Sequence, residues 1–205
     1  AHVATRQAAM AGGSLLVRPA RADVRPFRVD GRYATADIFA LFGIPFEHGQ
    51  RWSSADDASR THVVVLSETL DRKLFGGSGG VGQVVRLGEH DFRVIGVTAD
   101  WQPQPMFHAD LSAQSFGDAD QFFLPLSAAV DLKLPTNGNQ SGWGKDDTGD
   151  SMTSANMSWL QFWVQLQSPE QAQMYRQFLL DYSAQQKTLG RFQRPPTEAK
   201  LYSLM

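Results

Sequence analysis

The chain has 205 residues, of which 42% are hydrophobic and 20% are charged, and its 19 basic and 21 acidic side chains give a formal net charge of −2. A chain of this length buries roughly 70% of the surface that it exposes when unfolded, so it can form a large core without stabilising disulfides or metal sites. The balanced charge argues against a nucleic-acid-binding protein, which would carry a basic face. The lack of cysteine excludes disulfides, zinc–thiolate centres and a thiol nucleophile.

No apolar run approaches the roughly 18 residues that span a bilayer, and the first residues lack the basic and apolar regions of a signal peptide. The last residues end within an unfinished apolar pattern, Leu201 to Met205. We therefore expect this chain to be a piece of a longer protein.

The first third of the chain predicts a helix and then two strands. Residues 3–12 are rich in alanine and end at the pair Gly12 and Gly13, which indicates a short helix with a glycine C-cap. Strands are expected at 14–18 and 24–33, and a short helix at 38–42 after a cap at Thr35.

The middle of the chain alternates between strands and helices. Asp56 and Asp57 lie in a polar stretch that reads as a solvated turn, and the apolar run 63–66 predicts a buried strand. Ser67 then caps a helix that ends at Gly76. The remaining expected elements are a hairpin of strands 83–87 and 92–97, a strand at 122–126 and helical turns at 127–134.

The last third predicts a loop and then a β-α-β unit. Residues 136–158 are rich in Asn, Gly, Ser, Asp and Thr, which is typical of a long loop. A strand is expected at 159–166, and Ser168 with Gln171 predicts a capping box for a helix that reaches Lys187. A final strand is expected near 200–204, so the whole chain reads as mixed α and β.

The glycine cluster 76–82 matches the sequence patterns of two known motifs, one nucleotide-binding and one catalytic. Gly77, Gly79 and Gly82 match G-x-G-x-x-G, and Ser78 lies in G-x-S-x-G. Both motifs need a strand before them and a helix after them, whereas here a helix precedes and a strand follows. We therefore interpret the cluster as a helix C-cap and turn.

Other candidate sites are weaker. The five histidines show no metal-ligand spacing, and Asp146, Asp147 and Asp150 lack the glutamate that completes a calcium loop. We expect no metal and no cofactor. Trp101, Met106, Phe107 and Trp143 lie in loop-like surroundings, where they either anchor the core or form a partner-binding surface.

Three strings from residues 30–98 and one from 122–127 resemble the MacB-like periplasmic core domain of bacterial ABC transporter permeases. The strings are DGRYATADIFALFGIPFEHGQRW, VVVLSETLDRKLFG, VGQVVRLGEHDFRVIGV and FFLPLS. The order and spacing of these strings carry the resemblance, since each string alone is weak.

The resemblance implies an α+β fold with two lobes. Residues 1–36 and 157–205 would form a Porter-like β-α-β lobe, and residues 37–156 an inserted Sabre-like lobe that includes the loop 136–158. A Porter lobe opens with a strand before its first helix, so the expected helix at 3–12 implies that the first strand is missing. We also expect strands 14–18, 159–166 and 199–204 to share a sheet that excludes strand 63–66.

The function implied by the resemblance is that of a non-enzymatic periplasmic domain at the inner membrane. It would couple ATP-driven conformational change to export, with ATP bound by another domain or subunit. Its partners would be that ATP-binding part, a second permease copy, or a periplasmic adaptor, lipoprotein or peptide, with the aromatic residues Trp101, Met106, Phe107 and Trp143 as the candidate surface. Two alternatives stay open: a serine hydrolase that uses Ser78 with His90 or His62, and a peptide- or lipoprotein-binding adaptor module.

Overall fold

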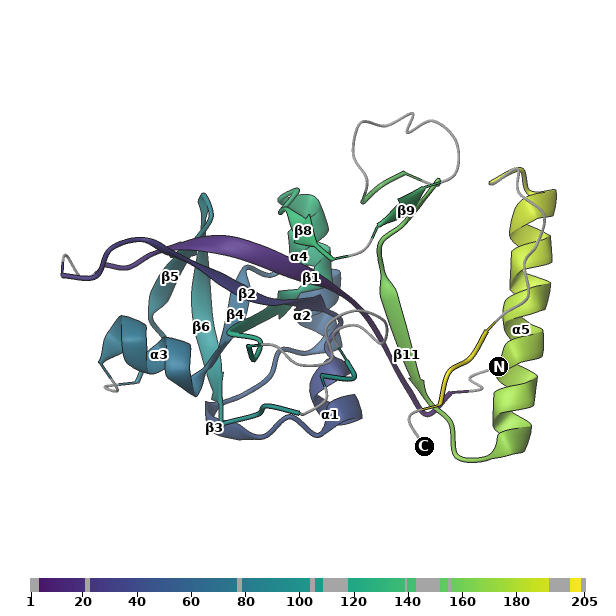
Figure 1. Ribbon diagram of the computed structural model, residues 1–205, viewed down its shortest axis with the longest axis horizontal. Coiled ribbons are helices and arrows are strands. Elements are labelled where there is room, and N and C mark those ends of the chain that lie inside the picture. The colour runs from purple at the N-terminus through teal and green to yellow at the C-terminus, as the bar shows by residue number, and fades with distance from the viewer. Residues whose placement is uncertain are drawn as a thin grey trace. The chain divides into compact units, whose positions relative to one another are not determined.

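The structure is a computed structural model in which residues 4–20, 23–76, 79–103, 106–108, 118–138, 140–142, 152–154, 156–191 and 200–203 are described. Its fold is mixed α and β, as expected (Figure 1). The chain divides into two compact units. One unit holds Ala8–Asn139 with Leu160–Phe162, and the other holds Ala1–Gln7, Gln140–Trp159 and Trp163–Met205.

Six strands of the larger unit pair into a closed ring, in the order β1-β2-β7-β4-β6-β5 and back to β1. The β2–β7 and β4–β6 pairs are parallel, and the other four pairs are antiparallel. Closure leaves no free edge between these strands, so the ring encloses its own interior. The bounds are β1 Arg6–Arg18, β2 Phe27–Ala34, β4 Val63–Ser67, β5 Val84–Leu87, β6 His90–Thr98 and β7 Phe122–Pro125.

The remaining strands are short. Strand β3 (Phe46–Gly49) pairs with β6, and β8 (Thr136–Asn137) pairs with β1. Strands β9 (Ser141–Gly142) and β10 (Met157–Ser158) pair with each other. Strand β11 (Gln161–Gln165) is a neighbour of β1 in the sheet order, and the backbone N–H of Thr5 donates to the carbonyl of Gln165.

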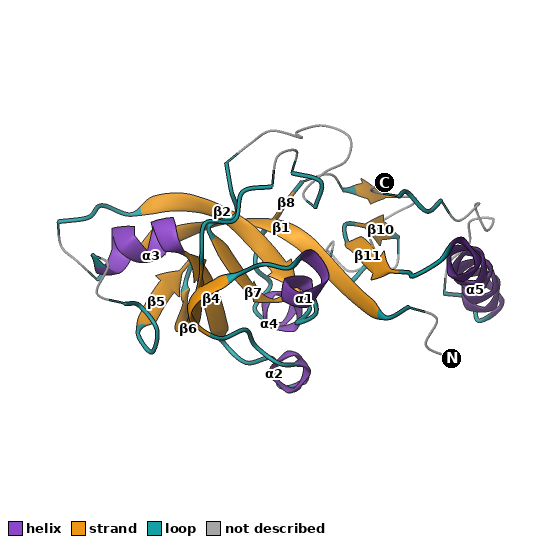
Figure 2. Cartoon of the chain, turned by 90° about the horizontal axis from the view of Figure 1, so that it is seen from below, coloured by secondary structure: helices purple, strands orange, loops and turns teal. Residues whose placement is uncertain are grey.

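Figure 2 shows the strands in orange and the helices in purple. The described helices are α1 Ile38–Phe42, α2 Ser54–Ala58, α3 Glu68–Phe75, α4 Leu126–Asp131 and α5 Pro169–Thr188. Within the part of the chain that the structure describes, no helix has the length and apolar character that a membrane span requires.

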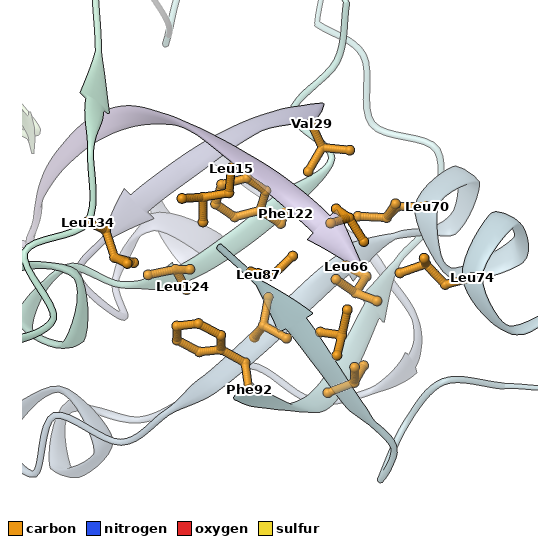
Figure 3. Close-up of a cluster of buried hydrophobic side chains, with 14 of the residues drawn as sticks. Leu15, Val29, Leu66, Leu70, Leu74, Leu87, Phe92, Phe122, Leu124 and Leu134 are labelled. Atoms are coloured by element: carbon orange, nitrogen blue, oxygen red, sulfur yellow. The ribbon is translucent and has the colours of Figure 1, made fainter. Parts of the chain in front are cut away.

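The core of the larger unit lies inside the closed ring of strands, and helix α3 packs against it. Figure 3 shows Leu15, Leu66, Leu87, Phe92 and Phe122 directed toward one another from different strands. The outer face of the same strands is also covered, because Phe39 of α1 packs edge-on against Trp52 and Phe123, with ring centroids 4.7 and 5.7 Å apart. Strand β4 is therefore buried on both faces, which explains its unbroken apolar run.

The predicted helix at 3–12 is wrong, because residues 6–12 of that range begin strand β1. Alanine favours helices locally, but β1 pairs with β2 from Met10–Ala34 to Val17–Phe27, and this pairing outweighs the propensity. Gly13 is not a C-cap. A Cβ atom there would lie 2.7 Å from Cε2 of Tyr33, so the glycine allows close strand contact. The inference that the first strand is missing depended on that helix and loses its basis.

Several local predictions are confirmed. Ser67 accepts a hydrogen bond from the backbone N–H of Leu70 and caps α3, and Gly76 ends that helix with φ of 70°. The hairpin β5–β6 pairs Val84 with Arg93 through Leu87 with His90. The cap of α5 is present in part: Ser168 accepts from the N–H of Gln171, but the side chain of Gln171 accepts from Gln167 and not from Ser168.

Three further predictions are wrong. Residues 200–203 are not a strand. Strand β4 is not excluded from the sheet of β1, because β2 and β7 lie between them and link them. Asp56 and Asp57 belong to α2 and not to a solvated turn: Asp56 completes a capping box with Ser53, and Asp57 accepts from the indole of Trp52.

The two compact units begin and end at other residues than the two expected lobes. Residues 8–36 pair with strands of the segment 37–139, whereas the expected lobes placed them with the C-terminal segment. The smaller unit does combine residues from both chain ends. Its helix α5 buries Tyr175, while Met174, Phe178 and Tyr182 are each about half exposed.

Candidate functional site

Two of the aromatic residues that we predicted as a partner surface, Trp101 and Phe107, lie around one histidine in the larger unit. The ring centroid of His108 lies 4.7 Å from that of Trp101 and 5.8 Å from that of Phe107. Phe42 at the end of α1 contacts both Phe107 and His108. We call these four rings the aromatic cluster.

Exposure differs between the predicted residues. Met106 is only 6% exposed, so it anchors this segment in the core. Trp101 and Phe107 are partly exposed. Trp143 lies outside the described residues. A partner that met this part of the surface would therefore contact Trp101 and Phe107 and not Met106.

His108 belongs to a buried polar triad. Its Nε2 lies 2.8 Å from Oδ2 of Asp120, and the same carboxylate accepts from Nε of Arg32 at 3.0 and 3.2 Å. The side chains of His108, Asp120 and Arg32 are 1%, 4% and 10% exposed. An ionised carboxylate only accepts hydrogen bonds, so Nε2 of His108 carries the proton in this pair.

Two opposing effects act on the pKa of Asp120. Burial alone would raise the pKa, but the hydrogen bond from His108 and the positive charge of Arg32 outweigh it and lower the pKa of Asp120 below its ordinary value. The carboxylate is therefore ionised at neutral pH. Among the described residues, Nδ1 of His108 has no hydrogen-bond partner.

The triad joins three separate segments. Arg32 lies on β2, Asp120 immediately precedes β7, and His108 follows the aromatic residues of the predicted surface. The carboxylate of Asp120 accepts hydrogen bonds from both Arg32 and His108, which holds these two partners in one arrangement. The triad thus fixes Trp101 and Phe107 relative to the sheet.

Sequence reasoning missed this triad. His108 and Asp120 are twelve residues apart and Arg32 is distant in sequence, so no motif spacing relates them. The strand itself gave no signal, because Arg28, Asp30 and Arg32 alternate with apolar residues, and this pattern predicts that all three are exposed. The structure buries only Arg32 of the three.

The glycine cluster does not have the context of a nucleophile elbow. It follows the C-terminus of α3 and precedes β5, as the sequence predicted, and Gly79 and Gly82 have positive φ values of 84° and 90°. Ser78 lies outside the described residues. His62 contacts the ring of Phe92, and His90 begins strand β6. In the described ranges, no three His, Asp or Glu side chains are grouped so that they could hold a metal ion.

The fold matches those of solved domains of transport proteins. The periplasmic region of MacB from Actinobacillus actinomycetemcomitans aligns with a TM-score of 0.59 and 15% identity, covering 91% of this chain and 68% of that one. The extracellular domain of the ABC-type transporter YknZ from Gram-positive bacteria aligns with a TM-score of 0.56 and 14% identity, covering 96% and 79%. At these identities the likeness shows a shared fold.

Sequence comparison gives the family. The model of the MacB-like periplasmic core domain matches residues 3–179. The chain therefore belongs to the MacB-like periplasmic core domain family, as the resemblance indicated.

Curated relatives are much longer proteins. The pyoverdine export ATP-binding/permease protein PvdT of Pseudomonas entomophila is 35% identical over 89 residues, which is 43% of this chain and 13% of that protein. The macrolide export ATP-binding/permease protein MacB of Chromobacterium violaceum is 40% identical over 63 residues, which is 31% of this chain and 10% of that protein. The matched parts thus span only about a tenth of these relatives.

Proposed function

We propose that this chain is the periplasmic domain of an inner-membrane ABC transporter permease that takes part in export. The family match over residues 3–179 is the observation that carries the proposal. The two curated relatives described above are named as export ATP-binding/permease proteins, which supports an ATP-binding domain or subunit elsewhere in the same transporter.

In this proposal the domain is non-enzymatic and transmits conformational change from ATP hydrolysis to a periplasmic partner. The partner is an adaptor, a lipoprotein or a peptide, or a second permease copy, and it contacts the partly exposed rings of Trp101 and Phe107. The buried triad supports this role, because a surface that transmits movement must be held firmly to the sheet behind it.

We also propose a two-lobe organisation of the Porter and Sabre type. The smaller compact unit contains both chain ends, which supports a lobe of that composition, although residues 8–36 cluster with the larger unit.

The transporter that contains this domain provides the first test. We expect Trp101→Ala and Phe107→Ala to lower export while ATP hydrolysis continues, because the rings contact the partner and not the nucleotide. Val84→Ala is a matched control, since Val84 is 57% exposed on β5. Equal loss of export in all three variants would contradict a specific surface.

The isolated chain provides the second test. We expect no binding of Mg·ATP at micromolar concentration in calorimetry and no labelling of Ser78 by a fluorophosphonate probe. Binding of the nucleotide or labelling of the serine would each contradict a non-enzymatic domain.

A further inference from the structure

A pocket of about 530 Å³ lies between α2, α4 and the end of β2 in the larger unit. This volume falls within the range of small-molecule sites. The pocket is separate from the aromatic cluster and the triad, which contribute none of its lining residues. Its wall carries two carboxylates, one guanidinium, two hydroxyls and two aliphatic side chains.

Arg60 reaches this pocket from a strained backbone position. It follows α2 with φ of 52°, where glycine is usual, and the turn has the two hydrogen bonds of a Schellman motif, from Arg60 N to Asp57 O and from Thr61 N to Asp56 O. Nη1 of Arg60 donates to Oδ1 of Asp131 at 2.5 Å. An arginine in the left-handed region costs about 1 kcal/mol more than glycine.

The same motif ends α4 and provides an internal comparison. Lys133 has φ of 52°, its N–H donates to Val130 O, and Leu134 N donates to Ala129 O. Lys133 does not line the pocket. The two positions therefore share a backbone conformation and differ in their access to the pocket.

Asp57 also lines the pocket. Its Oδ2 accepts from the backbone N–H of Ala36 at 2.8 Å, and its Oδ1 accepts from Nε1 of Trp52 at 3.0 Å. Burial raises the pKa of Asp57 despite these bonds. A bound cation would stabilise the ionised form, and each oxygen keeps a lone pair that can accept one more hydrogen bond.

Ser127 contributes a hydroxyl oxygen that is buried and has no hydrogen-bond partner among the described residues. A buried polar atom without a partner costs about 1–3 kcal/mol, so such atoms are normally satisfied by a partner, a water or a ligand. Leu126 and Val130 supply the apolar wall beside it.

We propose that this pocket binds a small aliphatic zwitterion of the α-amino-acid type. The ammonium group would be accepted by Asp57 and Asp131, the carboxylate would receive hydrogen bonds from Arg60 and Ser127, and the aliphatic chain would lie on Leu126 and Val130. Arg60 and Asp131 already pair with each other, so a ligand that carries both charges can replace their pair with two new ones, whereas a ligand with one charge leaves Arg60 or Asp131 without its partner.

Three matched probes test this proposal on the 205-residue chain: leucine, 4-methylpentanoate without the ammonium, and isoamylamine without the carboxylate. We expect leucine to bind, and each analogue to bind about tenfold more weakly or worse, since a charge-assisted hydrogen bond is lost in each case. The indole N–H resonance of Trp52 reports on Asp57 and should shift with leucine, while that of Trp101 should not.

Variants separate side-chain contact from backbone effects. We expect Arg60→Gly and Ser127→Ala to weaken leucine binding about tenfold, and Lys133→Gly to leave it unchanged. The proposal is overturned if leucine shows no saturable binding up to about 10 mM. Equal affinity for the three probes, or equal effects of Arg60→Gly and Lys133→Gly, would also overturn it. None of these outcomes depends on the transport role.

Discussion

Gly31 lies against Phe122 so closely that no larger residue fits between strands β2 and β7. A Cβ atom at Gly31 would lie 2.6 Å from the ring of Phe122 and would also meet its carbonyl oxygen. Gly31 pairs with Gly13 on the neighbouring strand β1, so the two glycines make room for the aromatic rings of Tyr33 and Phe122, whose centroids are 6.2 Å apart.

Gly31→Ala is therefore expected to destabilise the chain by about 3 kcal/mol, at the upper end of overpacking costs, as measured by urea unfolding. Gly79→Ala is the control, because its Cβ would meet nothing within 4 Å and only its φ of 84° is unfavourable. We expect the control to cost about 1 kcal/mol. Similar values for the two variants would show that the close contact is not decisive.

Asp120→Ala should be among the most destabilising single changes in this chain. It leaves Arg32 as a buried charge without its carboxylate, and breaking such a pair costs about 3–5 kcal/mol. The exposed pair Arg86–Asp91 gives the comparison: Asp91→Ala should cost less than about 1 kcal/mol. Free energies of unfolding from urea titrations check both values, and a small loss for Asp120→Ala would contradict a structural role for the triad.

The pH dependence of Asp120 has a defined sign. Because folding lowers the pKa of Asp120, its stabilising contribution is present above the unfolded-state value of about 3.9 and is lost as the pH falls through the lower folded-state pKa. The destabilisation caused by Asp120→Asn should therefore be full at pH 7 and smaller at pH 3. An equal loss at both pH values would contradict the lowered pKa.

Asp71 should show the opposite pH dependence. Burial raises its pKa, and the hydrogen bond from the N–H of Gly80 offsets this only in part. Its ionisation then costs stability as the pH rises from the unfolded-state value through the raised folded-state value. Asp71→Asn keeps an oxygen for Gly80, so the variant should gain stability relative to the parent between pH 4 and pH 7. Urea unfolding at the two pH values tests the direction.

Lys133→Gly should stabilise the chain by about 0.5–1 kcal/mol. Glycine removes the left-handed strain at φ of 52°, and this gain exceeds the added freedom of the unfolded chain. Thermal unfolding measures the change. The exposed Lys187→Gly inside α5 is the control and should destabilise by about 1 kcal/mol, because glycine is unfavourable within a helix.

The elements that sequence reasoning predicted correctly are those with local signals. The apolar run 63–66 followed by Ser67 is a strand and a helix cap because the neighbouring residues alone determine both. Residues 6–13 show the opposite case: their alanines favour a helix, but they form a strand because partner strands far away in the sequence pair with them, such as β2 from Met10 onward. Local propensity cannot report a partner strand.

The candidate site was predictable only in part for the same reason. Trp101 and Phe107 were recognised as large rings in loop-like surroundings, and they do lie together at the cluster. The residue that organises them, His108, depends on Asp120 and on Arg32 from β2, and no sequence spacing relates these three.

In the separate pocket between α2 and α4, Arg60 was missed because a Schellman motif that ends in arginine lacks the usual glycine signal.

Strand β1 is one continuous peptide that belongs to both compact units, with Arg6 and Gln7 in the smaller and the remainder in the larger. Its ladder with β2 runs over eight residue pairs, from Met10–Ala34 to Val17–Phe27. Antiparallel hydrogen bonds lie perpendicular to the strands, so tension along β1 loads this whole ladder in shear instead of opening it one bond at a time. A pull on the Gln7 end would therefore displace the ring as a body before it detached the strand.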